Sequence, residues 1–127
     1  MNSIITLLTS IFIFFTNPAD IPYLTIEKAM IANDSKAIIY FGKETILLNI
    51  LGKEGAYNNS QAEIILGVFF TKKPKGSFIF IYKGKETNDG TFGIGMYTYN
   101  KEKFRVTFHF RDVYNSSKLE SLKIEKL

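Results

Sequence analysis

The sequence contains no cysteine and no tryptophan, and it has one histidine and three prolines. Without cysteine the chain has no disulfide, no thiol nucleophile, no zinc site of the cysteine type and no lipid anchor on an N-terminal cysteine. The lone histidine, His109, cannot build a zinc site without clustered carboxylates, and none are spaced for it. We therefore expect no metal and no cofactor.

Charge of one sign is not concentrated in any segment. The net charge is +4, but lysine and glutamate alternate through the predicted turns, as in Lys101-Glu102-Lys103. A nucleic-acid-binding domain usually gathers its basic residues on one face, so we expect no nucleic-acid partner. A small basic cluster of Lys72, Lys73 and Lys75 complements the C-terminal end of a predicted helix, and an anionic partner is the alternative.

Long apolar runs are scarce as well, and the main one lies at the N-terminus. Residues 4–15 have the length of a signal-peptide core and fall short of the ~20 residues that span a bilayer. This predicts a signal peptide over residues 1–19, no stable membrane span after its removal, and a protein of the periplasm or cell envelope. Because no basic residue precedes the run, a buried first element and an uncleaved interfacial anchor are alternatives.

The remaining residues, 20–127, are enough for one domain with a substantial core. Apolar residues make up 46% of the chain, with twelve phenylalanines and seven tyrosines. The first half has helical patterning. We expect a helix capped by Asp20 that ends near Asn33, a short helix from Ser35 to Gly42, and a helix opened by a capping box of Ser60 and Glu63 and ended by Pro74.

Strand patterning dominates the rest. A strand over Thr45–Leu51 precedes the third helix, and the second half alternates with a period of two. It predicts the strands Phe78–Lys83, Thr91–Tyr99, Phe104–Asp112 and Lys118–Glu125, joined by short turns and therefore antiparallel. Helices followed by a meander indicate an α+β fold with the helices on one face of a curved sheet.

Alternation assigns the two faces of this sheet. Phe104, Val106, Phe108 and Phe110 should face the helices, together with Phe92, Ile94 and Met96. The opposite face would then carry Gly93, Gly95, Tyr97, Tyr99, Arg105, His109 and Arg111. Tyrosine and arginine are favoured at interfaces, so Tyr97, Tyr99, Arg105, His109 and Arg111 are candidates for a homodimer interface.

Several motifs resemble one family. They are Tyr40-Phe41-Gly42, Gly52-Lys53-Glu54-Gly55 with Tyr57, Gln61-Ala62-Glu63 leading to Phe69-Phe70, and the closing Leu122–Lys126. Together they are similar to small exported proteins of Gram-negative bacteria that are catalogued only as a domain of unknown function. The resemblance implies a cystatin-like, nuclear-transport-factor-2-like cone, in which three helices pack into a bent antiparallel sheet that often dimerises through its outer face. It assigns no catalytic residue, and it supports the signal peptide.

Two classes of function fit these observations. The first is a non-catalytic binding or interaction module, whose apolar concavity holds a small hydrophobic ligand between Phe69, Phe80, Met96 and Phe108 or is filled by its own side chains. The second is an isomerase or dehydratase. In that case Asp112, at the open end of its strand, would be the base, with its pKa raised by an apolar pocket.

Overall fold

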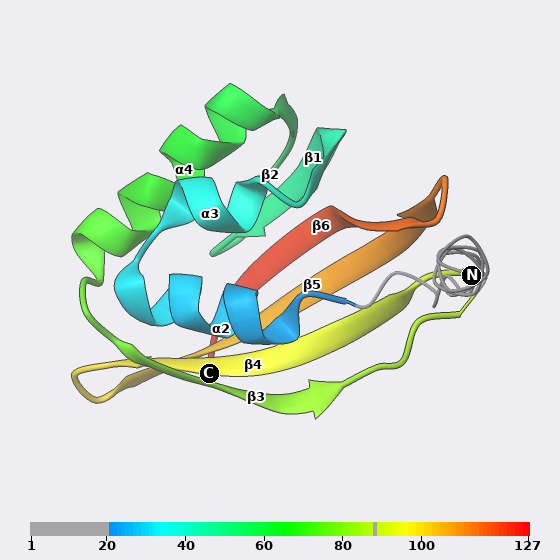
Figure 1. Ribbon diagram of the computed structural model, residues 1–127. Coiled ribbons are helices and arrows are strands. Elements are labelled where there is room, and N and C mark those ends of the chain that lie inside the picture. The colour runs from blue at the N-terminus through cyan, green and yellow to red at the C-terminus, as the bar shows by residue number, and fades with distance from the viewer. Residues whose placement is uncertain (1–20, 88) are drawn as a thin grey trace, which may run out of the picture.

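The computed structural model describes residues 21–87 and 89–127. The predicted signal peptide and Asp20 lie outside the described residues. Three helices come first or interrupt the early strands: α2 (Tyr23–Ala32), α3 (Ser35–Ile39) and α4 (Asn59–Lys72). Figure 1 shows them together above the sheet. Within the described part of the chain, no helix combines the length and apolarity needed to cross a membrane.

The helix ends differ from prediction in several places. α2 begins after Pro22, which makes no side-chain cap, so the predicted cap at Asp20 is wrong, and α3 ends at Ile39, before Gly42. Asp34 caps α3 by accepting a hydrogen bond from the Ala37 amide at 3.0 Å. The capping box of α4 is formed by Asn58 and Gln61 rather than by Ser60 and Glu63, so that prediction is wrong by two residues. Both pairs match the pattern, but Asn58 still has an extended backbone and the helix begins directly after it.

Six strands form one sheet in the order β2-β1-β6-β5-β4-β3. Their bounds are β1 (Gly42–Ile50), β2 (Lys53–Asn58), β3 (Ser77–Lys83), β4 (Thr91–Tyr99), β5 (Glu102–Val113) and β6 (Ser116–Lys126). The predicted meander is present as β3 to β6. The pairing of β1 with β6 is parallel, while every other pairing is antiparallel.

Strand β2 was not predicted, because Gly52–Gly55 has the composition of a loop. Leu51 and Gly52 have φ values of 54° and 89°, and they form a tight two-residue turn. The chain therefore reverses at once, and β2 pairs with β1 along its whole length. The resulting β1–β2 hairpin lies beside α4.

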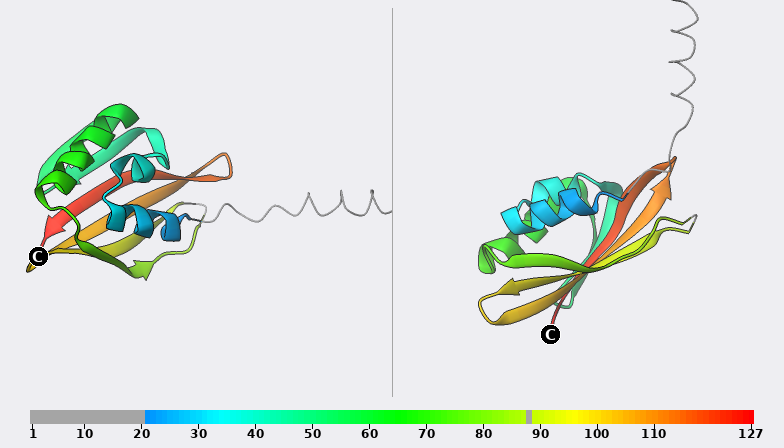
Figure 2. Two further views of the ribbon diagram at one scale, coloured as in Figure 1. Left: turned by 60° about the vertical axis from the view of Figure 1, so that its left-hand side comes forward. Right: turned by 60° about the horizontal axis from the view of Figure 1, so that its bottom comes forward.

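The helices all cover one face of the strongly bent sheet, as the two views of Figure 2 show. The core lies between these layers, and β5 contributes Phe104, Val106, Phe108 and Phe110, all of them buried as predicted. α2 packs over β3, and α4 packs over β1 and β2. The fold class predicted from the sequence, α+β with helices on the inner face of a curved sheet, is confirmed.

The assignment of faces along β4 is wrong. Gly93, Gly95 and Tyr97 lie opposite Phe108, Val106 and Phe104, so they face the helices. Met96 pairs with Arg105 and lies on the outer face, together with Phe92 and Ile94. Glycine is needed on the inner face because the rings of Tyr23 and Phe78 occupy the space there. A side chain at Gly93 would collide with the Tyr23 ring, and one at Gly95 with the Phe78 ring.

Candidate functional site

The cavity expected between Phe69, Phe80, Met96 and Phe108 is occupied by packed rings. The ring centroids of Phe80 and Phe108 are 5.6 Å apart, and those of Phe69 and Phe104 are 5.4 Å apart. Phe69, Phe80 and Phe108 are buried, and Met96 lies on the other face of the sheet. The middle of the inner face is therefore closed by the protein's own side chains.

Asp112 lies at the rim, as its position near the strand end allowed. It is exposed and pairs with Ser117 across the β5–β6 ladder. An enzyme of this kind would also need a hydrogen-bond donor such as a tyrosine hydroxyl. Partial burial raises the pKa of the Tyr23 hydroxyl. That hydroxyl donates a hydrogen bond to the Gly84 carbonyl at 2.7 Å, so it ties α2 to the loop after β3. Among the described residues, this hydroxyl bonds to main-chain oxygens and no hydrogen bond joins it to Asp112.

A groove opens instead between α4 and the β1–β2 hairpin, with a volume of about 320 Å³. We call it the α4 groove. Its described lining residues are mainly apolar: Ile50, Leu51, Lys53, Tyr57, Ile65, Val68, Phe69, Lys72 and Lys73. Ile65, Val68 and Phe69 recur at helical spacing along α4, so they share one face of that helix. Ile50 and Lys53 are opposite each other in the hairpin, so they share the inner face of the sheet.

Gly55 determines the position of one groove wall. It lies two residues before Tyr57 on the same face of β2, and a side chain at Gly55 would collide with the Tyr57 ring. The ring can therefore fold back along the edge strand. Of the residues predicted to line a pocket, Phe69 alone lines the α4 groove. The helical pattern of the sequence could have indicated the groove residues on α4. The opposite wall could not be predicted, because it belongs to β2, a strand that the sequence pattern did not predict.

Three of the lining residues are lysines: Lys53 at the start of β2, and Lys72 and Lys73 at the end of α4. Because α4 follows β2 directly and packs back over it, these three residues lie toward the same end of the α4 groove. The Lys73 amine is bound to the Glu102 carboxylate at 2.8 Å, and Lys126 binds the same carboxylate at 3.1 Å. The hydrogen bond from Lys73, followed by that from Lys126, lowers the pKa of Glu102. Within residues 21–87 and 89–127, neither Lys53 nor Lys72 forms an ion pair.

The outer face of the sheet carries part of the predicted interface. Arg105, His109 and Arg111 are exposed there, as expected. Tyr97 is fully buried, and Tyr99 packs against the core on the helix side, so both were assigned to the wrong face. Tyr97 and Tyr99 lie on the same face of β4 as Gly93 and Gly95. The register with β5 turns that face toward the helices.

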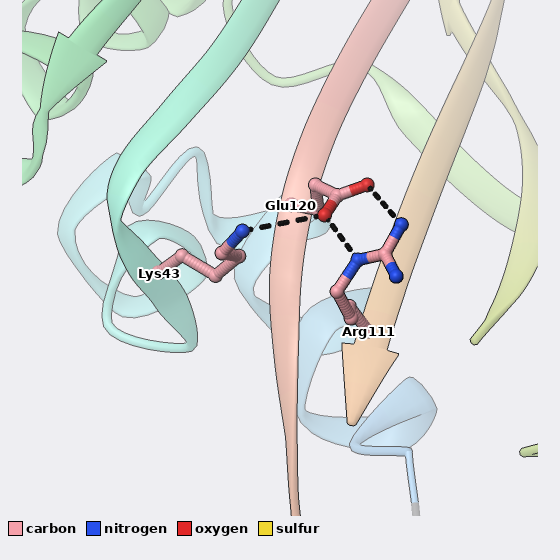
Figure 3. Close-up of polar contacts among 3 residues, drawn as sticks. All are labelled: Lys43, Arg111 and Glu120. Atoms are coloured by element: carbon pink, nitrogen blue, oxygen red, sulfur yellow. Dashed lines mark hydrogen bonds and ion pairs between the residues drawn. The ribbon is translucent and has the colours of Figure 1, made fainter. Parts of the chain in front are cut away.

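Ion pairs link the charged residues of this outer face. Glu120 accepts hydrogen bonds from both Arg111 and Lys43, which come from the strands on either side of β6 (Figure 3). The hydrogen bond from Arg111, more than that from Lys43, lowers the pKa of Glu120. Arg105 pairs with Glu125 at 3.1 Å. Both arginines are thus already bound to carboxylates within the sheet.

Beside these charges lies an apolar area that we call the outer patch. It consists of side chains on the outer face of β3 and β4: Ile79, Ile81, Tyr82, Phe92, Ile94 and Met96. Ile79 and Ile81 are 61% and 59% exposed, which is far more than a strand residue facing a core. The His109 ring contacts the Phe92 ring in a tilted arrangement at the border of the patch, with ring centroids 5.7 Å apart.

The described residues contain no group of three or more histidine, aspartate or glutamate side chains that could hold a metal ion. The same part of the chain shows no carboxylate in the lining of the α4 groove. The chemistry that this groove offers is therefore an apolar surface with amines at one end.

Comparison with known proteins gives a family without an assigned activity. The model of DUF4783, a domain of unknown function, matches residues 24–125. A DUF4783 family protein from Bacteroides uniformis is 25% identical, with a TM-score of 0.77, and the match covers 84% of this chain and 97% of that one. One from Bacteroides fragilis is 28% identical, with a TM-score of 0.75, and covers 85% and 100%. No curated protein matches.

More distant solved structures share the fold alone. A domain with a cystatin-like fold from Nostoc punctiforme is 7% identical, with a TM-score of 0.64, and the match covers 83% of this chain and 72% of that one. NTF2-like proteins are also among the matches. The resemblance drawn from the sequence motifs is thus confirmed. The chain belongs to the DUF4783 family, a domain of unknown function with a cystatin-like, NTF2-like fold.

Proposed function

We propose that this protein is a non-catalytic binding module of the cell envelope, and that the α4 groove holds a small apolar ligand. The observation that carries the proposal is the groove itself, an open and mainly apolar hollow of about 320 Å³ between a helix and the sheet. Ligand sites typically measure roughly 300–1,000 Å³. The groove is at the lower end of this range, which suits a single small molecule or one alkyl chain.

The enzymatic alternative has less support. A carboxylate base at the mouth of the cone needs an apolar surrounding that raises its pKa. Asp112 is exposed at the rim, and the inner face beside Phe108 is filled by aromatic rings. In the described residues, the α4 groove has lysine amines but no carboxylate in its lining. Binding without turnover is therefore the simpler function for this site.

A fluorescence titration with a neutral apolar dye, N-phenyl-1-naphthylamine, tests the proposal on the purified protein. Val68 lines the groove and is 47% exposed, so the larger side chain of Val68→Trp should fill the groove. Dye binding should weaken about tenfold or more, which corresponds to the loss of one well-packed apolar contact. Ile64→Trp is the matched control, because Ile64 is an exposed residue of the same helix that does not line the groove. No dye binding, or equal binding by both variants, would overturn the proposal.

A second candidate function is self-association through the outer patch. Large exposed apolar areas on a protein surface mark interaction sites, and this one is contiguous across β3 and β4. The Arg105–Glu125 ion pair beside the patch carries one positive and one negative charge. In a symmetric dimer, Arg105 of one copy can therefore face Glu125 of the other. The proposed partner is therefore another copy of this chain.

Sedimentation equilibrium across a range of concentrations tests the homodimer. The protein should dimerise, and Ile79→Lys with Ile81→Lys should yield a monomer. Ile64→Lys introduces the same charge at a similarly exposed position on α4 and should leave the dimer intact. A protein that stays monomeric at the highest concentration would contradict this second candidate.

A further inference from the structure

The α4 groove combines an apolar wall with amines at one end only. We infer that its ligand is an amphiphile of the fatty-acid type, with one alkyl chain and a carboxylate head. This inference rests on the proposed function and specifies the class of ligand. Two independent features carry it: the charge around the groove and the limited size of its apolar part.

Lys53 carries most of the charge argument. Lys72 is in the last turn of α4 and Lys73 is its C-cap residue, where a positive charge also stabilises the helix dipole. Lys53 belongs to β2, so the helix end does not account for it. It lies opposite Ile50 on the inner face, and the hydrocarbon stem of a lysine packs along apolar surface while its amine stays in water.

The three amines differ in their freedom to bind an anion. Lys73 is held by Glu102, and its amine also lies 5.5 Å from the centre of the Tyr99 ring. Lys53 and Lys72 form no ion pair with any described residue. With no acidic side chain among the described lining residues, the groove mouth is positively charged. An anionic head suits this mouth, whereas a cationic head would be repelled.

Size restricts the apolar part of the ligand. A hollow of about 320 Å³ is at the small end of ligand sites, so it suits one chain better than the two chains of a phospholipid. The opposing explanation is that Lys53 only protects an edge strand. β2 is at the edge of the sheet, and natural edge strands often carry lysine to prevent aggregation. The two explanations differ in what Lys53 does to ligand affinity.

Competition against the neutral dye separates these possibilities, using three ligands with the same ten-carbon chain below their micelle-forming concentrations. Decanoate should displace the dye at a concentration about tenfold lower than decanol does, the typical effect of a charge-assisted hydrogen bond. Decyltrimethylammonium should be weaker than decanol. The preference for decanoate should shrink at high salt, because exposed charges are screened.

Variants then assign the preference to the two lysines. Lys53→Gln with Lys72→Gln should bring the affinities for decanoate and decanol within about twofold of each other. Lys28→Gln with Lys36→Gln removes the same charge from exposed positions on α2 and α3 and should have no effect. Equal displacement by decanoate and decanol, or an undiminished preference in the first double variant, would overturn the inference.

The same titrations keep the inference apart from the function on which it rests. If the dye binds in the groove and decanol displaces it as well as decanoate does, the groove is a ligand site without head-group selection. If the dye binds and Val68→Trp weakens its binding, but neither decanol nor decanoate displaces it, the groove remains a ligand site and the inference about its ligand class is overturned. Binding to anionic phospholipid vesicles in preference to free decanoate would identify a membrane surface as the target and contradict a free fatty acid.

Discussion

The phenol oxygen of Tyr97 lies 2.6 Å from the main-chain oxygen of Lys73, to which it donates a hydrogen bond. The same oxygen accepts hydrogen bonds from the Gly76 amide at 2.9 Å and from the Asn33 side chain at 3.0 Å. One hydroxyl on β4 therefore joins the end of α2 to the connection between α4 and β3. It also holds in place the segment that carries two of the lysines at the α4 groove.

Tyr97→Phe should lower the free energy of unfolding by about 1–3 kcal/mol, since it leaves buried polar groups without a partner. Urea denaturation measures this change. Tyr99→Phe is the control, because Tyr99 lies on the same strand and face, and its hydroxyl has no hydrogen bond to any described residue. A loss of equal size in both variants would show that the hydroxyl network contributes little.

Two glycines should respond in opposite directions to alanine. Gly95→Ala would place a methyl group in the Phe78 ring and should destabilise the fold by about 1–3 kcal/mol. Gly67 lies within α4, and a methyl group there meets only the Ser35 hydroxyl oxygen at 3.4 Å. Gly67→Ala should therefore stabilise the protein by roughly 0.5–1 kcal/mol. Thermal unfolding of both variants tests the pair, and a stabilised Gly95→Ala would contradict the register of β4.

Acid should weaken the outer face through Glu120. The Arg111 and Lys43 partners lower its pKa below the ordinary value of 4.5, so its contribution to stability is complete above that pH and is lost as the pH falls through the lower, folded-state pKa. Because the Glu120 side chain is only partly buried, at 28% exposure, solvent still screens the ion pairs and we expect at most about 1 kcal/mol. Urea titrations between about pH 5 and pH 2 should give a shallower loss for Glu120→Gln than for the unchanged protein.

Glu63→Gln provides the comparison for this pH experiment. Glu63 is on α4 and forms no ion pair with the described residues. Its substitution removes the same charge without breaking an ion pair, so it serves as the control for Glu120→Gln. If Glu63→Gln and Glu120→Gln flatten the slope equally, the bridge between β1, β6 and β5 has no particular role in acid sensitivity.

If residues 1–19 are a signal peptide, as the sequence predicts, the mature protein is shorter than the full chain. Mass spectrometry of protein from the envelope fraction should find an N-terminus created by cleavage within residues 15–19. Leu8→Arg places a charge in the apolar run and should leave the full-length precursor in the cytoplasm. An intact Met1 on envelope-associated protein would favour the uncleaved anchor instead.

Local patterning was sufficient for the helices, the meander and the buried face of β5, because each depends on neighbouring residues in the chain. It failed where packing between distant segments decided the outcome. Gly93 and Gly95 look like an outer surface until the rings of Tyr23 and Phe78 are known to occupy the space above them. The α4 groove was missed for a related reason, since its second wall is a strand with the composition of a loop.

The place of β6 between β1 and β5 has a consequence for the order of events in folding. Before the eleven residues of β6 are available, the chain has only the β1–β2 hairpin and the strands β3 to β5. Among the described residues, no strand pairing connects these two parts. Closure of the sheet then depends on a parallel pairing between the first and the last strand in the chain, and contacts between such distant segments form slowly. The domain therefore completes its fold only after its last residues are free, and a chain passed through a membrane pore would arrive before it had folded.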